Sequence, residues 1–143
     1  MANAIYPKYK ESLISGSTDI SLTGTNVKVS LINTALTPYD VSHTFYSDLD
    51  DVTDQGVLST ITIGNTTVVG GLFDGDDVIF PASDLAPRVP VATGNALLIW
   101  IDTGDEATSR LVAFLDTSVS GLPVSPNNSN IEIEWNASGI FQL

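Results

Sequence analysis

The chain has 143 residues, a length that suits one domain built around one hydrophobic core. Its 17 acidic residues against 5 Lys plus Arg give a formal net charge of -12, which disfavours binding to nucleic-acid phosphates or to an anionic membrane surface. The absence of cysteine excludes disulfides, thiolate catalysis and cysteine-ligated metal sites.

The surface must rely on uncharged residues, because charged ones make up only 15 % of the chain against roughly 25 % in ordinary soluble domains. Ser, Thr, Asn and Gly are abundant instead, and these side chains are easily buried where subunits meet. This favours a protein that assembles. The N-terminus has no signal-peptide pattern, and no run approaches the ~18 apolar residues that span a bilayer. We therefore expect synthesis in the cytosol.

The N-terminal segment, 1–16, carries Tyr6 and Tyr9 at helical spacing. Pro7 suits a first helical turn and Gly16 suits a C-terminal stop, so a short helix is predicted. Such a helix is too short to be stable alone and must dock on the rest of the chain or on a neighbour. Tyr6, Pro7 and Tyr9 are therefore the predicted partner-contact residues, with packing of the tyrosines on their own domain as the alternative.

The period then changes from helical to two, which predicts successive strands. A first strand is expected over 27–32, followed by a long polar loop over 33–54 with one helical turn around 39–47. Gly64-Asn65 suggests a tight hairpin, and three prolines within 81–95 suggest an extended crossover. The further predicted strands are 58–63, 67–72, 77–80, 96–102, 110–116, 131–135 and a final 140–143.

Short strands without intervening helices predict one domain over 1–143 with an all-β fold. Antiparallel strands of this kind indicate a sandwich or a barrel, here with a short N-terminal helix, and a long crossover among such strands is what Greek-key and jelly-roll topologies require.

Candidate catalytic groups have simpler explanations. Glu132 and Glu134 share one face of a strand and suggest an acid/base pair, but alternation with a buried face produces the same spacing. His43, the only histidine, lies near Ser42 and Asp40, yet no nucleophile elbow supports a triad. No phosphate-binding loop is present either, so we predict no enzymatic activity and no cofactor.

Two acidic clusters, 48–54 and 74–77, offer oxygen ligands of the kind that Ca²⁺ prefers. Neither has the spacing of an EF-hand loop, and Asp and Gly are also ordinary turn residues. We therefore predict no metal site.

Several stretches together resemble the capsid decoration, or cement, proteins of tailed bacteriophages. They are MANAIYPKYKE at 1–11, VKVSLI at 27–32, GLFDGDDV at 71–78, IWIDTG at 99–104 with ATSRL at 107–111, GLPV at 121–124 and IEIEW at 131–135. The resemblance implies an antiparallel jelly-roll-like β-sandwich with a short N-terminal helix. It also implies a structural protein on the exterior of the virion capsid, assembled as a homotrimer and bound to the major capsid protein.

Two other functions fit the same pattern. Small β-rich domains also serve as tail, neck or fibre-associated virion components. A carbohydrate-binding β-sandwich module would use Trp100 or Trp135 as a stacking platform, although both lie among apolar neighbours, where core packing is the stronger expectation.

Overall fold

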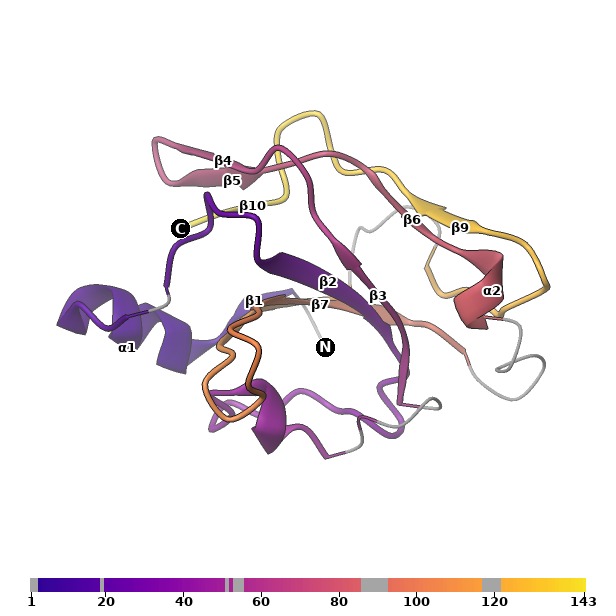
Figure 1. The fold of residues 1–143 in the computed structure, drawn as a ribbon, viewed down its shortest axis with the longest axis horizontal. Helices are drawn as coiled ribbons and strands as arrows, with labels where there is room; N and C mark the ends of the chain where they lie inside the picture. Colours follow the sequence, from indigo (N-terminus) through magenta and orange to yellow (C-terminus); the bar gives the residue numbers. More distant parts are fainter. Residues whose placement is uncertain (1–2, 19, 51, 53–55, 86–92, 117–121) are drawn as a thin grey trace.

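A computed structural model describes residues 3–18, 20–50, 52, 56–85, 93–116 and 122–143, and its regular structure is mostly antiparallel β (Figure 1). The elements in chain order are β1 (Ala4–Ile5), α1 (Pro7–Ser15), β2 (Val27–Ile32), the 3₁₀ turn η1 (Tyr46–Asp48), β3 (Val57–Thr62), β4 (Thr67–Val69), β5 (Leu72–Asp74), β6 (Val78–Phe80), α2 (Ala82–Leu85), β7 (Ala96–Ile101), β8 (Leu111–Leu115), β9 (Ile131–Ile133) and β10 (Phe141–Gln142).

The larger layer is a five-stranded sheet with strand order β1-β8-β7-β2-β3. Its neighbouring strands are antiparallel, and β2 pairs with β7 from Val27 opposite Ile101 to Ile32 opposite Ala96. Because side chains alternate along a strand, Val27, Val29 and Leu31 share one face, and all three are fully buried. The strand predicted over 27–32 is confirmed.

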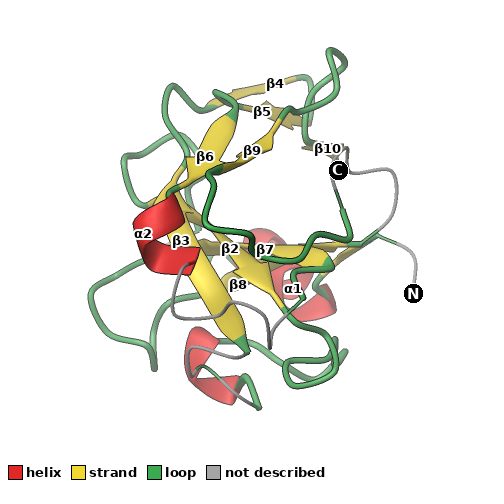
Figure 2. Ribbon diagram, turned by 90° about the vertical axis from the view of Figure 1, so that its right-hand side faces the viewer, coloured by secondary structure: helices red, strands yellow, loops and turns green. Residues whose placement is uncertain are grey.

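The second layer consists of two small antiparallel sheets, one ordered β10-β5-β4 and one that pairs β6 with β9. Figures 1 and 2 show both small sheets on the same side of the larger sheet. Phe73, Phe80 and Ile133 of this layer are buried in the same hydrophobic cluster as β2 and β7. The mostly β, antiparallel architecture is thus as predicted.

Strand β7 is covered on both faces, since all six of its residues are buried. The segment over 33–50 lies on the side of the large sheet opposite the small sheets (Figure 1). From this segment Tyr46 packs on Trp100 with 4.4 Å between ring centroids, and Tyr39 packs on Phe114 at 5.5 Å. The described part of the polar loop predicted over 33–54 therefore covers the sheet. Its 3₁₀ turn η1, at 46–48, overlaps only the end of the helical turn predicted around 39–47.

Helix α1 is confirmed with the signals expected at its ends. Pro7 occupies the first turn, and Gly16 ends the helix in the left-handed conformation with φ of 70°. The hydroxyl of Tyr9 donates to the carbonyl of Ile20 at 2.8 Å. The helix is therefore docked on its own chain.

The strand predicted over 67–72 is wrong, because the chain turns in the middle of it. Gly70 and Gly71 have φ of 61° and 82°, the positive values at both central positions that a type I′ turn requires. Val69 pairs with Leu72 across this two-residue turn, so β4 and β5 form a tight hairpin. The hairpin predicted at Gly64-Asn65 is also wrong, since β3 and β4 belong to different sheets.

The extended crossover predicted over 81–95 is wrong at its start and lies partly outside the described residues. Residues 82–85 form the one-turn helix α2. The side-chain oxygen of Asn130 accepts the free N–H of Ala82 at 2.8 Å, which satisfies a donor that a helix start leaves unpaired. No helix in the described part of the chain has the length and apolarity to cross a bilayer.

Candidate interaction surface

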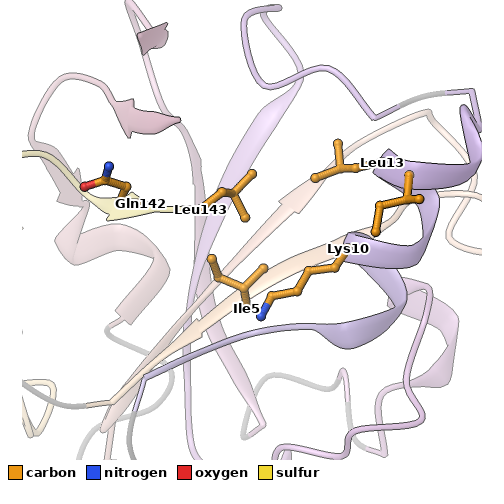
Figure 3. A pocket seen from close by; sticks show the side chains of 6 residues that line it. Ile5, Lys10, Leu13, Gln142 and Leu143 are labelled. Carbon is orange, nitrogen blue, oxygen red and sulfur yellow. The ribbon is translucent and has the colours of Figure 1, made fainter. Parts of the chain in front are cut away.

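An open apolar groove lies between α1 and the C-terminal strand (Figure 3). Its volume is about 370 Å³. Its lining residues are Ile5, Lys10, Leu13, Ile14, Gln142 and Leu143. Ile14 and Leu143 are 89 % and 53 % exposed, so large aliphatic side chains face solvent here. We refer to these six residues as the α1–β10 groove.

A smaller hollow of about 270 Å³ continues the α1–β10 groove along the strands. It lies between Asn3–Ile5 on one side and Ile140–Gln142 on the other, and it shares Ile5 and Gln142 with the groove. The two hollows together mark an opening between the layers, where β1 of the large sheet and β10 of a small sheet are both edge strands. Unpaired strand edges offer backbone N–H and C=O groups to another strand.

Lys10 places a positive charge beside this apolar surface. The ion pair found among the described residues joins Lys8 to Glu11 at 3.0 Å on the same helix, and Lys10 has no acidic partner within the described part of the chain. Only 5 of the 143 residues are Lys or Arg. An uncompensated cation in so acidic a chain favours a partner that brings a carboxylate to this position.

Of the three predicted partner-contact residues, two are buried and one is exposed. Tyr6 and Tyr9 are 1 % and 2 % exposed, so their rings lie in the core of their own chain, as the alternative interpretation has it. Pro7 is exposed. The predicted partner-contact residues do not include Ile14. Its position directly after Leu13 lies outside the buried stripe that contains Tyr9, and this marks it as an exposed apolar residue.

A polar pocket of about 370 Å³ lies beside η1 and the large sheet. It is lined by Tyr46, Thr60, Trp100, Asp102, Gly104, Glu106 and Ser109. Burial, with the charge of Glu106 as a smaller cause, raises the pKa of Tyr46 to about 12. Trp100 is only 8 % exposed and donates its indole N–H to Ser30 at 2.9 Å. No open ring face is therefore available for a sugar at Trp100.

Trp135 is partly buried against the core, and its indole N–H donates to the carbonyl of Asp76 at 2.8 Å. On the preceding strand, Ile131 and Ile133 are buried while Glu132 is exposed, and Glu134 is exposed as well. The spacing of the two glutamates is thus the alternation of a strand with one buried face.

His43 does not connect Ser42 to Asp40 as a catalytic triad would. Ser42 donates directly to the Asp40 carboxylate from its N–H at 2.7 Å and its hydroxyl at 2.6 Å. These bonds hold the pKa of Asp40 below its usual value. The Nδ1 atom of buried His43 has no hydrogen-bond partner among the residues that the structure describes. The three side chains are therefore close in sequence but not arranged for nucleophilic catalysis.

The described aspartates of the acidic clusters accept hydrogen bonds from neighbouring loop residues. Asp48 accepts the N–H groups of Thr44 and Phe45, both at 2.8 Å, and the bond from Phe45 is the largest cause that lowers the pKa of Asp48. Asp76 accepts the side-chain amide of Asn65 at 2.7 Å. Among the described residues, no three His, Asp or Glu side chains come together as a metal site would require. Residues 51, 53 and 54 of the first cluster lie outside the described residues.

Comparison with protein families, with characterised proteins and with solved structures finds no match for this chain.

Proposed function

We propose that this chain is a virion structural protein that decorates the outer face of a phage capsid and stabilises contacts between major capsid subunits. The observation that carries the proposal is the α1–β10 groove, an exposed apolar surface between two unpaired strand edges. Contiguous exposed apolar surface of this kind is typical of sites that bind other proteins. The sequence resemblance to decoration proteins favours the major capsid protein as the partner.

The acidic character of the chain supports an exterior position. A net charge of -12 repels nucleic-acid phosphates, so a shell with DNA inside offers such a protein its outer face. We propose no catalytic role, no cofactor and no direct contact with nucleic acid or membrane.

The mechanism is stabilisation by mass action. A ligand that binds the mature shell, and not its earlier or disrupted forms, stabilises that shell by its own binding free energy. If a homotrimer bridges several capsid subunits, each weak contact raises the effective concentration of the next. Stabilisation then grows with occupancy of the lattice.

We propose that the two layers form a jelly-roll-like sandwich. Nested pairing supports this topology, since β1 pairs with β8, β2 with β7 and β4 with β5. Within the large sheet, β2 with β3 and β7 with β8 are also antiparallel neighbours. An experimental structure that lacked these pairings would contradict the topology.

Two measurements test the function. Quantitative mass spectrometry of purified virions should find the chain in hundreds of copies, as a lattice position requires; a few copies would indicate a tail, neck or fibre component instead. Purified protein should also bind expanded heads that lack it and raise the temperature at which they disrupt. Absence from virions, together with no binding to heads, would refute a virion role.

A further inference from the structure

The β4–β5 hairpin presents an unprotected edge at the far side of the three-stranded sheet. Thr67, Val68 and Val69 are all exposed, with Val69 at 75 % and Val68 at 44 %. Natural edge strands are commonly protected by their short length, a Lys, a Pro or a bulge; β4 is short, with three residues, but has no Lys, Pro or bulge. Its three β-branched residues instead favour pairing with another strand.

The same sheet ends in a second free edge at β10, so β4 and β10 are its two borders. Val69 and Leu72 flank the two-residue turn as a hydrogen-bonded pair, and the alternation of the ladder then turns the N–H and C=O of Val68 outward. Leu143 donates its N–H to Gly71 at 2.9 Å, so the same alternation turns the backbone groups of Gln142 outward. Each border therefore has outward-facing backbone N–H and C=O groups that can pair with those of the other border.

Side chains beside the two borders are also complementary. The exposed valines of β4 match the aliphatic lining of the α1–β10 groove, where Ile14 and Leu143 face solvent. Asp74, Asp76 and Asp77 follow the hairpin turn and bring negative charge to its base. Lys10 supplies the positive charge in the groove, and it has no acidic partner among the described residues of its own chain.

We propose that the β4 hairpin of one copy docks in the α1–β10 groove of the next, so that the three-stranded sheets of successive copies form one continuous sheet. The contact is head-to-tail, and contacts of this type close into a ring when the rotation between copies allows it. The inference rests on the proposed function only in that a decorating protein is expected to self-associate. The β4 hairpin and the α1–β10 groove are then the two surfaces through which copies of the chain associate.

Disulfide cross-linking between two single-cysteine variants tests the contact directly, because the native chain has no cysteine. Val68→Cys and Gln142→Cys proteins, one of them carrying a mass tag, are mixed and oxidised under native conditions. The expected product is a covalent heterodimer of the two variants. Val41→Cys is the matched control for Val68→Cys, since Val41 is also an exposed valine at 61 % but lies in the segment over 33–50.

The double variant Val68→Cys with Gln142→Cys adds a second readout. Within one chain these positions lie two strand spacings and one residue apart, about 10 Å, which exceeds the roughly 7 Å that a disulfide can bridge between Cα atoms. Oxidation should therefore give covalent rings or ladders of several chains. Val69→Lys and Ile14→Lys should each weaken self-association at least about tenfold in sedimentation velocity, and Val41→Lys should leave it unchanged.

The outcomes separate this inference from the proposed function. A heterodimer from Val68→Cys and Gln142→Cys supports the contact, whereas cross-links between two Val68→Cys chains alone would overturn the head-to-tail arrangement. A chain that stays monomeric at all concentrations also overturns it, even if wild-type protein still binds heads. Cross-linking without any binding to heads would uphold the contact and remove the capsid function.

Discussion

The buried phenol of Tyr6 allows the folding free-energy cost of an unpaired hydroxyl in this core to be measured. Its ring is 1 % exposed, and its hydroxyl is buried without a hydrogen-bond partner in the described part of the chain. Burial, with smaller contributions from Tyr39 and Asp40, raises the pKa of Tyr6 far above its usual value, so the group is neutral. A buried polar group left without a partner costs about 1–3 kcal/mol of folding free energy. Tyr6→Phe should therefore stabilise the protein by about 1 kcal/mol.

Tyr9 provides the matched control on the same helix. It is buried to a similar extent, at 2 % exposed, but its hydroxyl donates to the carbonyl of Ile20 at 2.8 Å. Tyr9→Phe removes that bond and should destabilise the protein by about 1 kcal/mol. The two substitutions delete the same atom, so their opposite signs would isolate the effect of the hydrogen bond.

Urea denaturation followed by circular dichroism measures both variants. With an m-value of about 2 kcal/mol per molar urea, the midpoint should rise by roughly 0.5 M in Tyr6→Phe and fall by roughly 0.5 M in Tyr9→Phe. If Tyr6→Phe lowers the midpoint as much as Tyr9→Phe does, the Tyr6 hydroxyl has a partner in solution and the reasoning fails.

Three further predictions use the same denaturation assay. Asp48→Ala should destabilise the protein by about 1 kcal/mol because two backbone N–H groups lose their acceptor, and since the pKa of Asp48 is lowered in the folded state, its contribution should be complete above pH 4 and lost as the pH falls below it. Gly94→Ala should cost about 1–3 kcal/mol because a Cβ would come within 2.6 Å of the Leu31 side chain, whereas Gly24→Ala, whose Cβ would come no closer than 4.0 Å to the backbone nitrogen of Asn26, should be neutral; equal effects would contradict the packing argument. Burial raises the pKa of Tyr9 to about 12, so wild-type stability should be unaffected by this group below pH 10 and decline between pH 10 and 12, and the decline should be smaller in Tyr9→Phe.

Local patterns in the sequence predicted the regular elements well where one signal dominated. Pro7 and Gly16 marked both ends of α1, and alternation marked β2 over its full length. The prediction failed at residues 67–72, because an apolar run hid a turn whose only signal was Gly70-Gly71. At 82–85 the nearby prolines suggested extended chain, while the capping oxygen of Asn130 comes from 48 residues away and is not visible in a local pattern.

The interaction surface was less predictable because it depends on which strands become edges. Local patterns predict extended chain over 67–69 and 140–143 but not that both segments lie at the borders of one sheet. Tyr6 and Tyr9 suggested a partner contact through their residue type alone, and the fold gave both rings a place in the core. Ile14 faces solvent because the docked face of α1 is set by Tyr9 and Ser12.

The double-sided cover over β7 has a consequence for how the protein opens. Its backbone amides are shielded by a small sheet on one side and by the segment over 33–50 on the other, and both neighbouring strands are themselves paired. Amides in such a position exchange with solvent deuterium only when the whole domain unfolds. The exchange rate at Leu98 and Ile99 therefore reports the global unfolding free energy, while β4, exposed along its length, should exchange through small local openings.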